Sequence, residues 1–204
     1  LDSVVNLTFA RLPKYLNIDS SKIQVLAPMK SGVCGVDNLN KELQDKLNPP
    51  SLKKPELETE KVIYRLGDRV MQITNNYEQV FKKYEENGTI QEGTGVFNGD
   101  IGYIRAYREF NDFPELLIQY DNGLALAKSS DIKNLLLGYS ISIHKSQGSE
   151  YPAVVIPLFQ GPRMLMNRNL LYTAVTRAKK CVTIVGDDEV FYTMINNTSQ
   201  LKRY

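Results

Sequence analysis

The chain has 204 residues, of which 42% are hydrophobic and 24% charged, and its formal net charge is +2. This composition supplies a packed core and excludes a disordered or fibrous chain. Two cysteines and one histidine exclude a disulfide framework and are too few for a zinc site, so no metal site is expected. No apolar run is long enough to cross a membrane and no secretory signal opens the chain. We therefore expect a cytoplasmic protein with no membrane partner.

Charge is unevenly distributed along the chain. Residues 62–130 carry 7 basic and 10 acidic side chains, whereas residues 131–204 carry 9 and 5. The basic excess of the last third favours an anionic partner there, although a solvated surface explains it equally well. The chain also begins in mid-pattern at Leu1, without Met, so we expect it to be a segment of a longer protein.

The first third has alternating helix and strand signals. Apolar spacing predicts a helix over residues 3–16, with Pro13 near its end. A short buried strand follows at residues 23–27 and ends in a loop at Pro28. Residues 37–47 have the spacing of an amphipathic helix, which Asn48-Pro49-Pro50 ends. The Pro-, Lys- and Glu-rich residues 48–60 are predicted to form a linker or a surface excursion.

The middle of the chain is typical of a small β-barrel. Short strands are predicted within residues 62–74, 100–107 and 116–128. The Asp121-Asn122-Gly123 turn between two apolar runs indicates a hairpin, because Asn-Gly accepts the positive φ of a tight turn. The polar residues 75–99 are predicted to be a long mobile loop.

An α/β rhythm returns after residue 130. Strands are predicted at 135–143, 153–157 and 182–185, with helices at 169–180 and 187–196, the second capped by Asp187 or Asp188. Near-continuous Val and Ile runs indicate a parallel sheet covered on both faces. We therefore predict an α/β domain of residues 1–61 and 131–204, with residues 62–130 inserted as a barrel subdomain.

The polar turn 144–150 follows a predicted strand of this sheet. The carboxyl ends of parallel strands are where open α/β sheets bind ligands. His144, Lys145 and Ser146 offer donors suited to phosphate oxygens, and Gly148 lets the backbone come close. An ordinary polar loop is the alternative, but the whole seven-residue string between two apolar strands favours anion binding.

The predicted helix 169–180 carries one arginine, Arg177, among small residues. Spacing places Thr173, Arg177 and Lys180 on one face. Phosphoryl transfer needs a fixed cation against the charge that builds on the γ-phosphate, and a planar guanidinium suits that task. The alternative is an exposed arginine in a surface ion pair.

Two other patterns resemble nucleotide-binding sites, but neither is interpreted as one. Residues 182–189 end a strand in acidic residues, which resembles a magnesium site but is better explained as a helix cap. Residues 32–35 are glycine-rich, yet no Gly-Lys pair occurs anywhere in the chain. The Walker A loop is therefore absent, and the chain cannot hold ATP by that mechanism alone.

These strings, in this order, resemble the C-terminal RecA-like motor domain of superfamily 1 DNA helicases, closest to the RecD-like branch (exodeoxyribonuclease V alpha-chain type). Residues 24–40 resemble motif IV and its helix, residues 141–150 motif V, and residues 170–180 motif VI. Residues 67–72 and 98–102 resemble the edges of an inserted Src-homology-3-like barrel. The resemblance implies a RecA-like parallel sheet carrying that barrel.

The family also implies a role for each matching residue. Arg177 matches the motif VI arginine finger and would be the catalytic residue. The nucleotide would contact Lys30, Gln147, Gly148 and Glu150, and DNA would contact His144, Lys145 and Ser146. The implied cofactors are ATP and Mg²⁺, held mainly by a first motor domain that this chain lacks, with none bound tightly to the segment itself.

The resemblance thus implies one half of an ATP-dependent DNA helicase that moves 5′→3′. Its partners would be single-stranded DNA, duplex junctions and the N-terminal motor domain of the same protein. One alternative is a non-catalytic nucleic-acid-binding or protein-docking module that uses the barrel. A second is a stand-alone nucleotide hydrolase that uses Asp187 and Asp188, for which we expect no turnover by the isolated chain.

Overall fold

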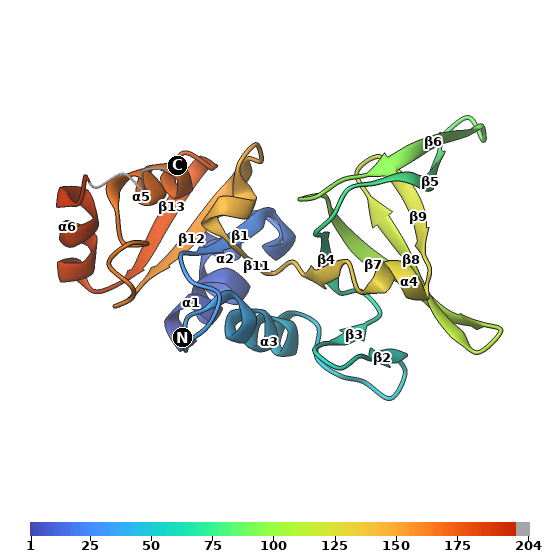
Figure 1. Cartoon of the computed structure of the whole chain (residues 1–204), viewed down its shortest axis with the longest axis horizontal. Helices are drawn as coiled ribbons and strands as arrows, with labels where there is room; N and C mark the ends of the chain where they lie inside the picture. The colour runs from blue at the N-terminus through green and yellow to red at the C-terminus, as the bar shows by residue number, and fades with distance from the viewer. Residues whose placement is uncertain (199–204) are drawn as a thin grey trace. The chain divides into compact units, whose positions relative to one another are not determined.

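The computed structural model describes residues 1–198 and contains two compact units (Figure 1). Unit 1 comprises residues 1–47 and 139–198 of the described chain, and unit 2 comprises residues 48–138. The last six residues of the predicted α/β domain, 199–204, lie outside the described residues.

Unit 1 is built on a parallel sheet with strand order β11-β1-β12-β13. Its strands are β1 (Ile23–Ala27), β11 (Ser140–Ser142), β12 (Tyr151–Leu158) and β13 (Ala178–Gly186). The strands β1 and β12 are buried almost throughout, as their Val- and Ile-rich sequences predict. The edge strand β13 is half-exposed, so the expected cover on both faces does not extend to it.

The helices of unit 1 follow the predicted order. Residues 2–16 are continuously helical through α1 (Asp2–Asn6), η1 (Leu7–Arg11) and α2 (Leu12–Leu16), and Asn17 ends the run with a φ of 52°. The amphipathic helix α3 (Val36–Leu47) buries Leu39 and Leu43. The remaining helical elements are η2 (Ser20–Lys22), η3 (Ile143–Ser146), α5 (Arg168–Val175) and α6 (Asp188–Asn196).

Two of the elements predicted after residue 130 differ in the structure. The helix predicted over 169–180 ends at Val175, and residues 178–180 already belong to β13. Parallel pairing of Ala178 with Tyr151 overrides the helical pattern there. The strand predicted over 135–143 is two strands, because β10 (Leu135–Leu137) pairs with β4 in unit 2 whereas β11 pairs with β1 in unit 1.

A buried asparagine holds the edge strand β11. The Asn40 Nδ2 donates to the Ser140 carbonyl at 2.9 Å, and the Ser140 N–H donates to Asn40 Oδ1 at 2.7 Å. Ser140 is fully buried, so water cannot replace these two bonds. The α3 side chain therefore takes the place of a neighbouring strand at this edge.

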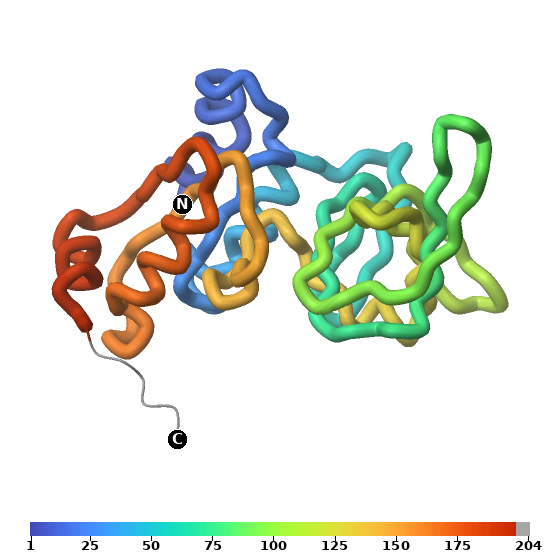
Figure 2. Tube along the Cα trace, turned by 90° about the horizontal axis from the view of Figure 1, so that it is seen from above, coloured from blue at the N-terminus to red at the C-terminus, as the bar shows by residue number. Residues whose placement is uncertain are grey.

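Unit 2 is an antiparallel sheet of order β10-β4-β7-β8-β9-β5-β6, curled around its own core (Figure 2). Its strands are β4 (Arg69–Gln72), β5 (Asn76–Tyr84), β6 (Ile90–Val96), β7 (Ile101–Phe110), β8 (Phe113–Tyr120), β9 (Gly123–Ala127) and β10. The helix α4 (Ser129–Ile132) and the two-stranded β2 (Glu56–Glu58) and β3 (Ile63–Arg65) complete it.

The hairpin predicted at residues 121–123 is present and joins β8 to β9. Its positive φ of 149° falls on Gly123, where a side chain would also collide with the Lys82 carbonyl of β5. A second tight turn, at Asn111-Asp112 with φ values of 50° and 64°, joins β7 to β8. Two successive positive φ values are typical of a type I′ hairpin turn.

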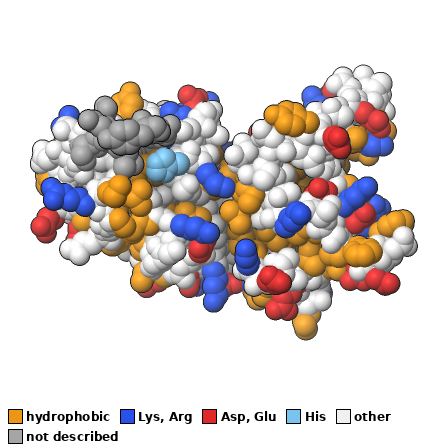
Figure 3. All heavy atoms as spheres, in the orientation of Figure 1, with side chains coloured by type: hydrophobic (Ala, Val, Ile, Leu, Met, Phe, Trp, Pro, Cys, Tyr) orange, Lys and Arg blue, Asp and Glu red, His pale blue; other side chains and the backbone are white. Residues whose placement is uncertain are grey.

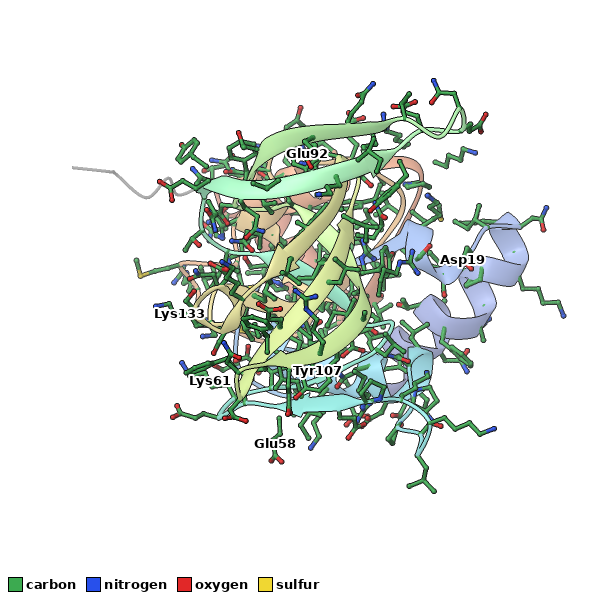
Figure 4. The ribbon with its side chains drawn as sticks, turned by 90° about the vertical axis from the view of Figure 1, so that its right-hand side faces the viewer. Asp19, Glu58, Lys61, Glu92, Tyr107 and Lys133 are labelled. Carbon is green, nitrogen blue, oxygen red and sulfur yellow. The ribbon has the colours of Figure 1, made fainter. Side chains whose placement is uncertain are left out.

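The predicted mobile loop at residues 75–99 is instead the β5–β6 hairpin, on which Figure 4 labels Glu92 of β6. Lys82 and Glu92 pair across the two strands at 2.9 Å. The Phe81 ring covers Gly93, where a Cβ would lie 2.4 Å from the ring. Cross-strand pairs and an aromatic ring over glycine stabilise a polar hairpin that strand propensity alone does not indicate.

Unit 2 begins earlier and ends later than the predicted insert of residues 62–130. At its start, the Asn48 Nδ2 donates to Asp68 Oδ1 at 2.7 Å and Arg65 Nη1 donates to the Asn48 carbonyl at 3.1 Å. At its end, β10 pairs with β4. These contacts attach residues 48–61 and 131–138 to the barrel unit. Within residues 1–198, no helix combines the length and apolarity that crossing a membrane requires.

The replacement Asn40→Ala should lower the free energy of unfolding by about 2–3 kcal/mol, because it leaves two buried backbone groups of Ser140 unpaired. Urea unfolding followed by circular dichroism measures the change. The control is Asn38→Ala, which removes one exposed bond to the Val33 carbonyl and should cost less than about 1 kcal/mol. Equal costs for the two variants would contradict the role of Asn40.

Candidate functional site

The polar turn after β11 has two halves. Its first half is the single helical turn η3, closed by the Ser146 hydroxyl, which donates to the Ile143 carbonyl at 2.6 Å. Its second half is a type II β-turn: Gln147 has φ −61° and ψ 132°, Gly148 has φ 85°, and the Ser149 N–H donates to the Ser146 carbonyl at 3.1 Å.

The residues of this turn differ in their exposure to solvent. Ser146 is fully buried and its hydroxyl donates within the turn, so the side chain expected to contact DNA is enclosed in this structure. His144, the pale blue side chain in Figure 3, is exposed, as is Gln147. Gly148 is exposed with open space where a Cβ would lie, so the turn needs glycine for its positive φ rather than for a close contact inside the chain.

Arg177 lies between the end of α5 and the start of β13, and its side chain is half-buried. Its Nε donates to the Thr173 carbonyl at 3.2 Å, and its Nη1 donates to the Ser149 carbonyl at 3.2 Å. Its Nη2 donates to the Thr176 hydroxyl at 3.3 Å. The guanidinium therefore joins the end of α5 to the turn at Gly148, and the cation lies at a helix C-terminus, where the helix dipole favours it.

Glu150, at the end of the same turn, pairs with Lys179 of β13 at 3.1 Å. Both side chains are more than half exposed, so the pair contributes little to stability. It holds the carboxylate beside the segment that carries Arg177. The predicted grouping of Thr173, Arg177 and Lys180 on one helix face is wrong, since Arg177 and Lys180 follow the helix.

Lys30 and Lys145 form a second group. They follow the carboxyl ends of β1 and β11, which are adjacent parallel strands. Burial lowers the pKa of Lys145 below its usual range, and the nearby Lys30 ammonium lowers it further. An anion bound beside Lys145 would offset this repulsion.

The strand directions assign the two groups to opposite ends of the strands. Lys30 and Lys145 follow the carboxyl ends of β1 and β11, whereas Glu150 and Arg177 precede the amino ends of β12 and β13. The expected nucleotide residue Lys30 thus follows the opposite end of a strand from Glu150 and Arg177, and it lies beside Lys145, an expected DNA residue.

Other candidate sites are less organised. Asp187 precedes α6 and Asp188 begins it; both are exposed, and no cluster of metal-binding side chains occurs among residues 1–198. In unit 2, a groove of about 330 Å³ lies beside the β2–β3 hairpin and α4. Its charged lining residues are two acids and two lysines, and Figure 4 labels three of them: Glu58, Lys61 and Lys133. These charges balance, so the groove shows no preference for an anion.

Sequence reasoning placed Thr173 near Arg177 but missed the other two residues that hold the arginine, Thr176 and Ser149. The only local signal was the Thr-Arg pair at the end of an apolar helix pattern. Ser149 supplies a backbone carbonyl, which no side-chain pattern reveals.

Two helicase families match the two units. The family described as "ATP-dependent RecD-like DNA helicase SH3 domain" matches residues 39–120. The family described as "UvrD-like helicase C-terminal domain" matches residues 137–185, which contain the turn 143–150 and Arg177. The chain thus combines a RecD-like helicase SH3 domain with a UvrD-like helicase C-terminal domain. The expected RecA-like sheet with an inserted SH3-like barrel is thereby confirmed.

Curated relatives of this RecD-like chain extend the match. An uncharacterized protein of Methanocaldococcus jannaschii is 30% identical over 197 residues, which are 90% of this chain and 16% of that protein. An ATP-dependent RecD2 DNA helicase of Deinococcus radiodurans is 32% identical over 157 residues, 77% of this chain and 19% of that protein. The RecD-like chain thus spans less than a fifth of the length of either. Among solved structures, Pif1 helicase from Bacteroides in complex with ADP-AlF3 and ssDNA aligns with a TM-score of 0.49 and 18% identity, over 95% of this chain and 46% of that chain.

The replacement Lys30→Gln should raise the pKa of Lys145, because it removes a nearby positive charge. An NMR pH titration of ¹³C-labelled lysine side chains measures the shift. Because the pKa of Lys145 is lower in the folded than in the unfolded protein, the free energy of unfolding rises with pH between these two pKa values. This pH dependence should weaken in the variant. The control is Lys14→Gln, which changes an exposed lysine of α2 and should leave the Lys145 titration unchanged. An unchanged Lys145 titration in Lys30→Gln would show that the Lys30 charge does not act on Lys145.

Proposed function

We propose that this RecD-like chain is the C-terminal motor part of an ATP-dependent DNA helicase and supplies an arginine finger. The observation that carries the proposal is the geometry of Arg177, which is held by three acceptors at a half-exposed position next to the turn 147–150. A fixed guanidinium costs no reorganisation when charge builds on a γ-phosphate.

The residues around Arg177 fit a triphosphate held mainly by another domain. Gln147 and Gly148 present an exposed turn, and Glu150 lies beside Lys179. Bound ATP with Mg²⁺ would supply the phosphoryl group and the metal charge. This chain would contribute the Arg177 cation, the polar turn at residues 147–150 and, within that turn, the carboxylate of Glu150. Because the sequence contains no Gly-Lys pair, we expect no ATP turnover by the segment alone.

DNA would contact the other end of the strands. Lys30 and Lys145 form a paired cationic site there, and the exposed His144 adjoins it. We therefore assign Lys30 to the DNA side, with His144 and Lys145, and leave Arg177, Gln147, Gly148 and Glu150 on the nucleotide side. Separate ends for nucleotide and DNA suit a motor, because closure at one end can shift the grip at the other. By family resemblance the movement is 5′→3′ along single-stranded DNA toward duplex junctions.

A nucleic-acid-binding role of unit 2 is a second candidate function. Exposed Tyr77 and Phe97 form an edge-to-face pair with ring centroids 5.6 Å apart. Exposed aromatic rings can stack on the bases of single strands. If unit 2 binds DNA without the motor, the isolated chain will bind single-stranded DNA tightly without nucleotide, and a titration at two salt concentrations will measure it.

The replacement Arg177→Ala in the complete protein should lower kcat for ATP hydrolysis by about 10³–10⁵ and abolish unwinding, because the γ-phosphate loses its cation. Binding of single-stranded DNA, measured by fluorescence anisotropy, should change by less than about threefold, because the DNA contacts are assigned to His144, Lys30 and Lys145 rather than to Arg177. The matched control is Lys180→Ala, an exposed β13 residue, which should keep wild-type turnover. Wild-type hydrolysis by Arg177→Ala would refute the arginine finger.

The replacement Lys145→Gln should weaken binding of single-stranded DNA and reduce the slope of log affinity against log salt by about 0.7, the value for one phosphate contact on a single strand. The matched control is Lys14→Gln, whose slope should equal that of the unchanged protein. An unaltered slope in Lys145→Gln would remove this lysine from the DNA contacts.

A further inference from the structure

The hydroxyl of Thr176 is placed between the end of α5 and the Arg177 guanidinium. Its Oγ1 lies 2.9 Å from the Tyr172 carbonyl and 3.1 Å from the Thr173 carbonyl, both on the last turn of the helix. A hydroxyl has one proton to donate, and these two carbonyls share it. The oxygen then has a lone pair for the Nη2 of Arg177, which donates to it at 3.3 Å.

The three bonds to Arg177 leave a defined set of donors unused. A guanidinium carries five N–H groups, one on Nε and two on each terminal nitrogen. The acceptors of residues 1–198 that bond to Arg177 are the Thr173 carbonyl, the Ser149 carbonyl and the Thr176 hydroxyl, one for each nitrogen. One N–H therefore remains on Nη1 and one on Nη2. Two N–H groups on the outer nitrogens are the donors with which arginine binds phosphate oxygens.

We propose that Thr176 is a positioning residue for Arg177: its hydroxyl fixes the plane of the guanidinium so that the two remaining N–H groups face the γ-phosphate together. The inference rests on the proposed arginine-finger function. Thr176 touches neither nucleotide nor DNA in this assignment. It acts through Arg177 alone.

The chemistry of the side chain decides between variants. Valine keeps the branched shape of threonine but cannot accept a hydrogen bond, so the Nη2 end of Arg177 loses its anchor. Serine keeps the hydroxyl and should keep the anchor. An arginine side chain held by fewer bonds must be ordered when it contacts the phosphate. We expect this ordering cost to slow the chemical step rather than to weaken ATP binding.

The test compares Thr176→Val with Thr176→Ser in the complete protein. We expect Thr176→Val to lower kcat for DNA-stimulated ATP hydrolysis about 10- to 100-fold, while the KM for ATP and the Kd for single-stranded DNA stay within about twofold. Thr176→Ser should restore kcat to within about threefold of the unchanged protein. Thermal melts of both variants monitor folding, and Thr176→Ala takes the place of Thr176→Val if the valine variant unfolds.

A double-mutant cycle separates positioning from a purely structural effect. In an Arg177→Ala background, Thr176→Val should cause no further loss of kcat, because nothing is left to position. An equal loss in both backgrounds would overturn the proposal, and so would wild-type kcat in Thr176→Val. Wild-type activity of Arg177→Ala itself would instead refute the arginine finger, so the two failures are distinguishable.

Discussion

The backbone bond between Tyr151 and Arg177 starts the parallel pairing of β12 with β13, and the position of Arg177 beside the turn 147–150 depends on it. The Tyr151 N–H donates to the Arg177 carbonyl at 2.8 Å. Pairing then continues from Ala153 with Cys181 to Leu158 with Gly186. At Gly186 the approach is so close that any Cβ would collide with the Leu158 carbonyl, which holds the register from the other end. Arg177 is thereby fixed beside the turn that precedes β12.

Because of that register, one polar turn connects the carboxyl end of β11 with the amino end of β12. The chain leaves β11 at Ser142, crosses β1, and enters β12 at Tyr151. Its first half, with His144 and Lys145, remains at the carboxyl end, and its second half, with Ser149 and Glu150, reaches the amino end. The buried Ser146 hydroxyl closes the first half and the glycine turn opens the second.

Unit 2 shows how cross-strand contacts compensate for weak strand signals. The β5–β6 hairpin has a largely polar sequence, but Phe81 over Gly93 and the Lys82–Glu92 pair fix its register. The type I′ turn at Asn111-Asp112 extends β7 and β8 beyond their apolar parts. Exposed aromatic residues remain on this unit, including Tyr77 and Phe97. The barrel thus combines a stable framework with surfaces available to a partner.

The sequence by itself determined the parallel sheet, the inserted barrel, the helix predicted at 37–47 and the hairpin at Gly123, because apolar periodicity and turn chemistry are local properties. It also located the two motif strings. Only the tertiary structure decided where the helix before Arg177 ends, that Ser146 is buried, and that Lys30 lies with Lys145 rather than with Arg177. Those outcomes depend on strand register, which joins residues far apart in the chain: the Ser149 carbonyl that holds Arg177 is 28 positions away. A backbone acceptor at that distance leaves no trace in the pattern of side chains.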